Sequence, residues 1–250
     1  MAEGNTSPQP VGGWATRELW VIPVAVSLCV LALRVPVAGR CPLPDDAFIT
    51  YRYAANLAAG KGFVYNRGEP ILGTTTPLLT VVLTLARRAG CDIPATAQTL
   101  SILASAAGAG LLAAVALATT GSVLVALAGG AFLGLSTYEA QIGAGGMEAP
   151  LLMVFILGSF LLLVRGRFTW GALLAALAAL TRPEGFLWWG LYGLLLWREG
   201  KLSRPVLAAG LGPIAVWFGH AVATFGSPLP HTMVAKVLQG QSPMARLTPP

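Results

Sequence analysis

Two adjacent carboxylates, Asp45 and Asp46, have the residue type and position that best suit acid–base chemistry in this chain. A carboxylate that solvent can reach accepts a proton from a hydroxyl group, and its efficiency depends on how near its pKa lies to the working pH. The pair begins a stretch, residues 44–60, whose Ala, Leu, Arg and Tyr residues predict a helix that stops at Gly60. In a competing structural interpretation, one aspartate is only the N-cap of this helix.

Arg52 and Asn56 follow Asp45 at the spacings i+7 and i+11, which places all three on one face of the predicted helix. A carboxylate, a cation and an amide on one stripe can bind a polyhydroxyl acceptor. Further ionisable residues lie at the ends of the later apolar runs or in the polar stretches beside them: Glu148, Arg182, Glu184, His231 and Lys236.

Each of these later residues has a structural and a functional interpretation, and the residues alone leave both open. Glu148 precedes an apolar run, where a negative charge is favourable at a positive helix end. Arg182 and Glu184 stand two residues apart in TRPEG and can form an interfacial ion pair. Alternatively, Arg182 binds a phosphate group, because a guanidinium matches phosphate with two parallel hydrogen bonds.

Apolar segments must position these residues, since 55% of the 250 residues are hydrophobic and only 10% are charged. Soluble domains carry roughly a quarter charged residues, and disordered chains have low hydrophobicity, so both classes are excluded. The net charge of +6 includes no basic cluster, which argues against a nucleic-acid partner. We therefore predict an all-α fold: a polytopic helical membrane protein whose surroundings are the lipid bilayer.

Seven apolar runs approach the length of about 20 residues that crosses a bilayer, so we expect about seven transmembrane helices. The first, residues 20–38, is the anchor, and Arg34 near its end can extend its side chain to the interface. A cleaved signal peptide is the alternative, although the preceding stretch is polar and barely charged. The other six form a bundle over residues 96–225. The seven runs are Trp20–Ala38, Thr96–Thr119, Ser122–Tyr138, Met147–Val164, Phe168–Leu180, Gly185–Trp197 and Val206–Phe225.

Basic residues in two short loops set the predicted orientation, because cytoplasmic loops carry an excess of Lys and Arg. Residues 1–19 are then a disordered cytoplasmic amino terminus, residues 39–95 an external loop with amphipathic or re-entrant juxtamembrane helices, and residues 226–250 an external tail. This count assumes that Pro77–Ala86, only ten residues long, does not cross. If it crosses, the orientation of everything after it reverses. The basic loop residues are Arg165, Arg167, Arg198, Lys201 and Arg204.

The stretches that carry these residues resemble the integral-membrane glycosyltransferases of the GT-C superfamily. They are, in order, DDAFITYRYAANLAAGKGFVYNRGE, GTTTP, GME, LTRPEG and LPHTMVAK. The chain is most similar to the bacterial branch with an opening DDAFI motif, which includes mycobacterial-type arabinofuranosyltransferases. The similarity extends from Asp45 to Lys236, and the opening motif is its most specific part. Because members of the family are commonly much longer, we expect this chain to be an amino-terminal portion.

The resemblance implies transfer of a sugar from a polyprenyl-phosphate donor to a hydroxyl group of a cell-envelope glycan, lipid or protein. It implies a multi-pass protein of the bacterial cytoplasmic membrane, with its active face outside the cytoplasm. An aspartate of the first external loop, Asp45 or else Asp46, would be the general base, and the anomeric configuration would invert. Arg182, Lys236 and, more weakly, His231 would stabilise the departing phosphate, and Glu148 would orient the substrate or the base.

Other interpretations stay open beside this one. The motifs require no cofactor, although adjacent aspartates are a weak signal for a divalent metal. A catalytically inactive fragment or a non-catalytic membrane subunit would explain the short chain. A lipid or sugar transporter would place ionisable residues in mid-membrane or use broken helices. Here the charges lie at the ends of apolar runs, and the sequence has no internal repeat.

Overall fold

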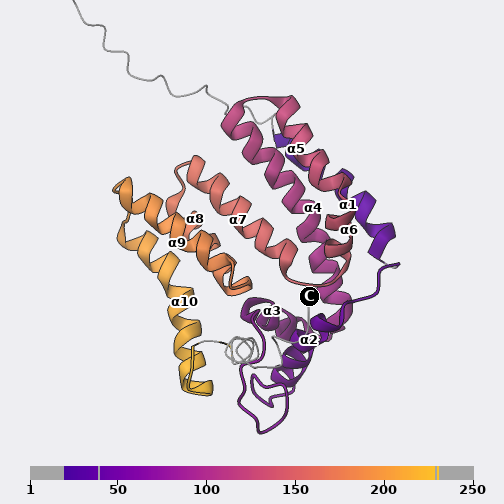
Figure 1. Cartoon of the computed structure of the whole chain (residues 1–250), viewed down its shortest axis with the longest axis vertical. Coiled ribbons are helices and arrows are strands. Elements are labelled where there is room, and N and C mark those ends of the chain that lie inside the picture. The colour runs from indigo at the N-terminus through magenta and orange to yellow at the C-terminus, as the bar shows by residue number, and fades with distance from the viewer. Residues whose placement is uncertain (1–19, 39, 229, 231–250) are drawn as a thin grey trace, which may run out of the picture.

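The computed structural model describes residues 20–38, 40–228 and 230, and these residues form ten α-helices and no β-strand (Figure 1). The predicted all-helical fold is therefore confirmed for this part of the chain. The helices are α1 (Val21–Ala38), α2 (Asp45–Ala58), α3 (Pro77–Arg88), α4 (Ile93–Thr120), α5 (Val123–Leu135), α6 (Thr137–Ala144), α7 (Ala149–Val164), α8 (Phe168–Thr181), α9 (Gly185–Arg198) and α10 (Arg204–Phe225).

The 28-residue helix α4 is the centre of the amino-terminal half, where α1, α5 and α7 pack against it (Figure 1). Its sequence is rich in Ala and Gly, and small residues allow helix backbones to approach closely. At Gly110 a Cβ atom would lie 2.6 Å from the carbonyl oxygen of Pro23, so α1 could not sit where it does. The Asp92 side chain caps α4 by accepting a hydrogen bond from the Ala95 N–H at 3.1 Å.

The carboxy-terminal half is built around α8, which contacts α7, α9 and α10. Alanines cover the buried sides of α8, so three neighbours pack against one short helix: Ala172, Ala175, Ala176 and Ala179 are all buried. The two halves meet where α7 packs against both α4 and α8.

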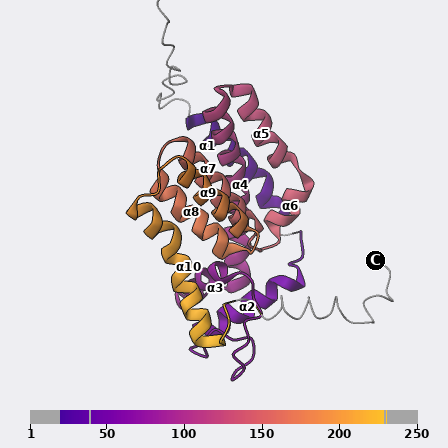
Figure 2. The same ribbon diagram turned by 60° about the vertical axis from the view of Figure 1, so that its left-hand side comes forward.

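The short helices α2 and α3 pack on each other and lie together at one end of the molecule in both ribbon views (Figure 2). We call this the α2–α3 end. Ala47, Tyr51 and Ala54 of α2 are buried in one apolar cluster with residues of α3 and of the start of α4. The Gln98 amide of α4 donates to the carbonyl oxygens of Ala38 and Ala144, both at 2.9 Å. The ends of α1, α4 and α6 therefore meet here.

Three of the described helices, α1, α4 and α10, are long and apolar enough to cross a membrane, and the α5–α6 pair would make a fourth. Helices α7, α8 and α9 have 16, 14 and 14 residues. Fourteen residues of helix span about 21 Å, less than the roughly 30 Å of a hydrocarbon core. The helices suit a membrane protein, but the expected number of about seven spans is not confirmed.

The run Ser122–Tyr138, predicted as one span, is instead two helices bent by 61°. Ser136 interrupts the run in an extended conformation, and its hydroxyl accepts a hydrogen bond from the Glu139 N–H at the start of α6. Arg34 is buried beside this break and donates to the carbonyl oxygen of Leu133 at 2.9 Å and to the hydroxyl of Ser105 at 3.4 Å. The prediction that its side chain extends to the interface is therefore wrong.

Candidate active site

Three charged residues that the sequence singled out meet beside the α2–α3 end, at the ends of α7 and α8 that face it. Arg182, just after α8, donates from Nη1 to Oε1 of Glu148 at 2.6 Å, just before α7. Its Nε and Nη2 atoms donate to the two carboxylate oxygens of Glu184 at 3.2 and 3.0 Å. We call Glu148, Arg182 and Glu184 the acid–arginine cluster. Its formal charge is −1, and it joins two loops that lie 34 residues apart in sequence.

Burial distinguishes the two carboxylates of the cluster. The Glu148 side chain is 6% exposed and that of Glu184 is 58% exposed. Burial raises the pKa of Glu148 above its ordinary value, although the nearby Arg182 opposes this change. The hydrogen bonds from Arg182 lower the pKa of Glu184, and pairing with Glu184 raises that of Arg182. Glu184 is therefore the partner of Arg182 that a ligand can reach.

Helix α2 docks on the loop that carries Glu148. The Tyr51 hydroxyl donates to the carbonyl oxygen of Gly146 at 2.9 Å. Gly146 has a φ of +65°, and a Cβ atom there would collide with that hydroxyl, so this contact requires glycine. Burial, followed by the charge of Glu148, raises the pKa of Tyr51 to about 12. The DDAFITY and GGME stretches, distant in sequence, are thus in direct contact.

Asp45 and Asp46 occupy the first turn of α2, and both are exposed. The N-cap position belongs to Pro44, without a side-chain hydrogen bond, so the prediction that an aspartate caps this helix is wrong. In the described part of the chain neither aspartate takes part in an ion pair. A Cβ atom on Gly145 would lie 3.7 Å from the Pro44 ring, which puts the start of α2 against the Glu148 loop. Both carboxylates are therefore open to a ligand at this end.

Asn56 and Arg52 differ in role, although both are on α2. Asn56 is buried, and its amide donates to the carbonyl oxygens of Val64 and Tyr65 at 2.9 and 2.8 Å. Arg52 is exposed, and its Nε donates to the same Tyr65 oxygen at 3.4 Å. The structure thus uses Asn56 to hold the following loop and leaves the Arg52 head group at the surface. The backbone carbonyls of a loop rich in turn residues need hydrogen-bond donors. The turn-rich sequence after α2 is therefore the signal that could have assigned this role to Asn56.

A cavity of about 210 Å³ adjoins the cluster. The sequence does not predict this cavity, because segments from three parts of the chain form it. Next to it, the hydroxyls of Thr50, Thr74 and Thr76 lie 2.9 to 3.4 Å apart in a buried triad. The sequence had indicated only hydrogen-bonding capacity in GTTTP. The cavity is lined by Leu72, Thr74, Thr75, Pro77, Ala179, Leu180, Pro183, Phe186, Trp217, Phe218, Pro228 and Pro230.

His231 and Lys236, the remaining predicted site residues, lie outside the described residues, as do residues 1–19 and most of the predicted tail. Among the residues that the structure describes, no three His, Cys, Asp or Glu side chains gather in a way that could hold a metal ion. Comparisons with protein-family models, curated proteins and solved structures return no match for this chain.

Proposed function

We propose that this chain is a membrane glycosyltransferase that moves a sugar from a polyprenyl phosphate to a cell-envelope hydroxyl group. The observation that carries the proposal is the acid–arginine cluster, which lies at the ends of apolar helices, where the start of α2 with its two exposed aspartates packs against the Glu148 loop. A lipid-borne substrate presents its phosphate and sugar at such a boundary. The resemblance to GT-C enzymes in DDAFI, GME and TRPEG supports the same function.

The basic residues of the short loops support an extracytoplasmic position for the α2–α3 end, and the basic residues of the long segment 39–95 carry less weight because the rule applies to short loops. At the ends of the helices remote from the cluster, Arg165 lies 4.1 Å over the ring of Trp20, and Lys201 lies 6.0 Å from that of Phe168. Clustered basic loops are typical of the cytoplasmic side. We propose that α7, α8 and α9 also cross, since a bilayer thins around short helices, giving about seven spans in the bacterial inner membrane.

The proposed reaction is a single displacement at the anomeric carbon. The acceptor oxygen forms a bond to that carbon while the bond from the carbon to the phosphate oxygen breaks, and its electron pair leaves with the phosphate. The acceptor proton passes to the carboxylate of Asp45 or, alternatively, Asp46. Attack and departure occur on opposite faces, so the configuration inverts. His231 and Lys236 are proposed to assist the phosphate on the basis of the resemblance alone.

Arg182 is the proposed phosphate-binding residue, and Glu184 is the group that the phosphate would replace. A guanidinium binds a phosphate as it binds a carboxylate, through two parallel N–H donors. The Nε and Nη2 donors now face the exposed Glu184, whereas Nη1 is held by the buried Glu148. Glu148 would therefore keep Arg182 oriented during the exchange. A fixed cation at the departing phosphate stabilises charge that develops in the transition state.

The cavity beside the cluster suits the first units of the lipid chain. Leu180, Phe186 and Phe218 give it apolar walls, and Pro183, the residue after Arg182, is part of its lining. A polyprenyl chain that enters here would bring its phosphate towards Arg182. Thr75 is also part of the lining and is proposed to bind the phosphate or the sugar, whereas the Thr74 hydroxyl is held in the buried triad.

The test is an assay of the full chain in lipid nanodiscs with radiolabelled polyprenyl-phosphate sugars of several types. We expect transfer from at least one donor, with loss of transfer in either Asp45→Asn or Asp46→Asn. Glu69→Gln is the matched control, since Glu69 is an exposed carboxylate at the same end that bonds only to Asn66 in the described structure. Unchanged rates in both aspartate variants would exclude either residue as the base.

A non-catalytic membrane subunit or a transporter is the second candidate, and the α5–α6 break favours the transporter. Broken helices beside a buried charge are typical of transport proteins, and here Arg34 is buried against the break. The nanodisc assay separates the candidates when it is paired with liposomes. Movement of a fluorescent lipid-linked sugar between leaflets, without transfer to an acceptor, would favour transport.

A further inference from the structure

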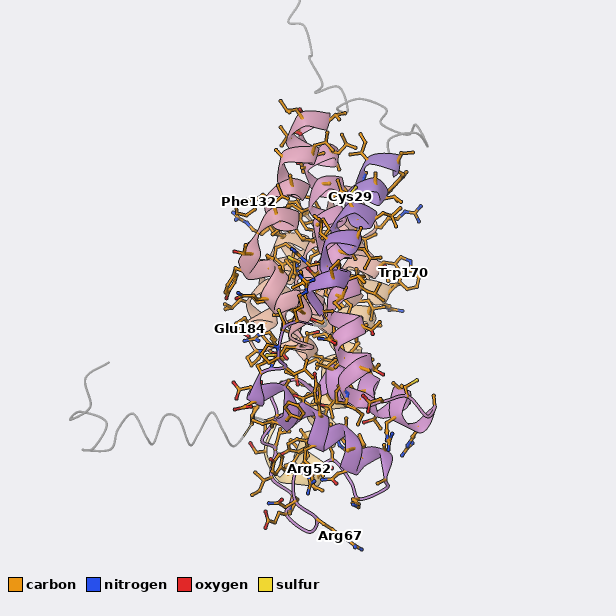
Figure 3. The ribbon with its side chains drawn as sticks, turned by 90° about the vertical axis from the view of Figure 1, so that its right-hand side faces the viewer. Cys29, Arg52, Arg67, Phe132, Trp170 and Glu184 are labelled. Carbon is orange, nitrogen blue, oxygen red and sulfur yellow. The ribbon has the colours of Figure 1, made fainter. Side chains whose placement is uncertain are left out.

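A second groove, of about 660 Å³, lies at the α2–α3 end, and no residue of the acid–arginine cluster lines it. Helix α2, the end of α3, the start of α4 and the loop after α2 all contribute to it. Figure 3 shows Arg52, one of its lining residues, well separated from Glu184 along the long axis of the molecule. The lining residues are Phe48, Tyr51, Arg52, Ala55, Tyr65, Arg87, Asp92, Ile93 and Pro94.

The charges in this groove suit an anion. Arg52 and Arg87 both line it, and both are exposed. Arg52 uses only Nε, in a long bond of 3.4 Å to Tyr65, and Arg87 takes part in no ion pair within the described residues. The neighbouring Arg88 is directed elsewhere, because its Nη2 donates to the carbonyl oxygen of Leu57 at 3.4 Å. The groove thus has two guanidinium groups available for a phosphate or carboxylate.

Aromatic and carboxylate groups in the same groove suit a sugar ring. Phe48 is 49% exposed and Tyr65 is 44% exposed, so two large rings face solvent beside the arginines. Aromatic walls with a few convergent polar groups are typical of small-molecule sites, and the C–H face of a sugar packs on such rings. One oxygen of Asp92 caps α4, which leaves the other to accept a hydrogen bond from a ligand hydroxyl.

We propose that this groove binds an anionic carbohydrate, a sugar or cyclitol ring that bears a phosphate or a carboxylate. The anionic group would lie between Arg52 and Arg87, the ring against Phe48 and Tyr65, and a hydroxyl at Asp92. Such a group can come from the head of a membrane lipid or from a soluble sugar phosphate. The proposal concerns binding alone, so its test does not require transfer.

The experiment measures binding to the full chain in two arms. The first titrates soluble myo-inositol 1-phosphate by calorimetry, and the second compares nanodiscs that contain phosphatidylinositol with nanodiscs that contain phosphatidylglycerol. Binding in the first arm identifies a soluble source. Binding only to phosphatidylinositol identifies a lipid head group. Absence of binding in both arms, or equal binding of the two lipids without binding of the soluble probe, would overturn the proposal.

Two variants distinguish binding in this groove from attraction of the anion to positive surface charge in general. Arg87→Gln should weaken binding by about tenfold or more, the factor for losing one charge-assisted hydrogen bond. Arg88→Gln removes the same charge from the same exposed helix end and should change affinity less than about twofold, because an exposed charge outside the groove contributes little. Equal losses in the two variants would overturn the proposal. Both residues are exposed, and size-exclusion profiles will verify that each variant is folded.

Discussion

Two arginines in this chain have opposite surroundings. Arg34 is 4% exposed inside the bundle, and its described partners are a backbone carbonyl and a hydroxyl. The Arg182 side chain is 31% exposed beside the α2–α3 end, and its partners are two carboxylates. Arg34 donates to Leu133, two residues before the end of α5, where the break at Ser136 leaves carbonyls without helical partners. Arg182 instead joins two loops through charges.

We propose that this difference separates a structural arginine, Arg34, from a functional one, Arg182. Arg34 is buried between its partners, the Leu133 carbonyl and the Ser105 hydroxyl, so a ligand cannot replace them without opening the bundle. One partner of Arg182, Glu184, is exposed and belongs to a short turn that a ligand can reach. We therefore expect substitutions at Arg34 to change stability and those at Arg182 to change chemistry.

Arg182→Gln should have the largest effect. Loss of the cation at the departing phosphate should lower the transfer rate by about a hundredfold or more, the range for removing one transition-state donor. Initial rates with the best donor in nanodiscs provide the measurement. Arg67→Gln, which removes an exposed arginine of the loop at the same end, is the control and should retain its rate. A wild-type rate for Arg182→Gln would remove the distinction between the two arginines.

Arg34→Met should have the next largest effect, on stability. The substitution keeps an unbranched side chain of similar length but leaves the Leu133 carbonyl without its donor, which costs about 1–3 kcal/mol. Thermal unfolding in detergent measures this, with Arg40→Met, at an exposed position, as the control. At a temperature where the variant is folded, transfer should continue. Loss of transfer with unchanged stability would mean that Arg34 takes part in the reaction and would contradict its structural role.

A smaller effect is expected in the pH dependence of stability. Burial raises the pKa of Glu148, so the folded chain holds this proton to a higher pH than the unfolded chain does. The contribution of Glu148 to stability therefore falls as pH rises above the ordinary glutamate value of 4.5. Unfolding midpoints across that range should fall in the wild type and fall less in Glu148→Gln.

Glu184 provides the matched control for that series, because its pKa is lowered by Arg182. The contribution of Glu184 to stability is present above the ordinary glutamate pKa and is lost as pH falls through the folded-state pKa of Glu184. This pH dependence is opposite to that of Glu148. The wild type should therefore lose stability at acid pH as Glu184 becomes protonated, and Glu184→Gln should not show this loss. The same pH slope in both variants would contradict the assignment of one buried and one exposed carboxylate.

Tyr51→Phe should have the smallest effect. It removes the single hydrogen bond to Gly146 and should cost about 1 kcal/mol, the net contribution of a typical hydrogen bond. Chemical denaturation measures this, and Tyr65→Phe, on an exposed ring, is the control. A cost near zero would mean that apolar packing alone holds α2 on the Glu148 loop.

Local features of this fold could be predicted from the sequence, whereas contacts between distant segments could not. The sequence predicts that the helix from Asp45 ends near Gly60, and α2 ends at Ala58. This agreement is expected because acidic residues and glycines are local signals for the start and the end of a helix. The break at Ser136 was missed, since the run around it is apolar and lacks proline. Without that break, nothing indicated a buried partner for Arg34.

The candidate site shows the same limit. Residue types placed Glu148, Arg182 and Glu184 at helix ends, but their pairing depends on how α7 and α8 pack. Asn56 was placed on the stripe of Asp45 by helical spacing, yet its amide is used by the loop at Val64 and Tyr65. Helical spacing predicts which residues share one face of a helix. It does not predict which residues of the following loop contact that face.

Measurements of donor binding will show whether Glu184 and the donor phosphate compete for Arg182. Dissociation constants for a polyprenyl-phosphate sugar would be measured on the wild type, Arg182→Gln and Glu184→Gln in identical nanodiscs. We expect opposite changes: weaker binding in Arg182→Gln and tighter binding in Glu184→Gln, because the guanidinium is then free for the phosphate. Weaker binding in both variants, or no change in either, would contradict this expectation.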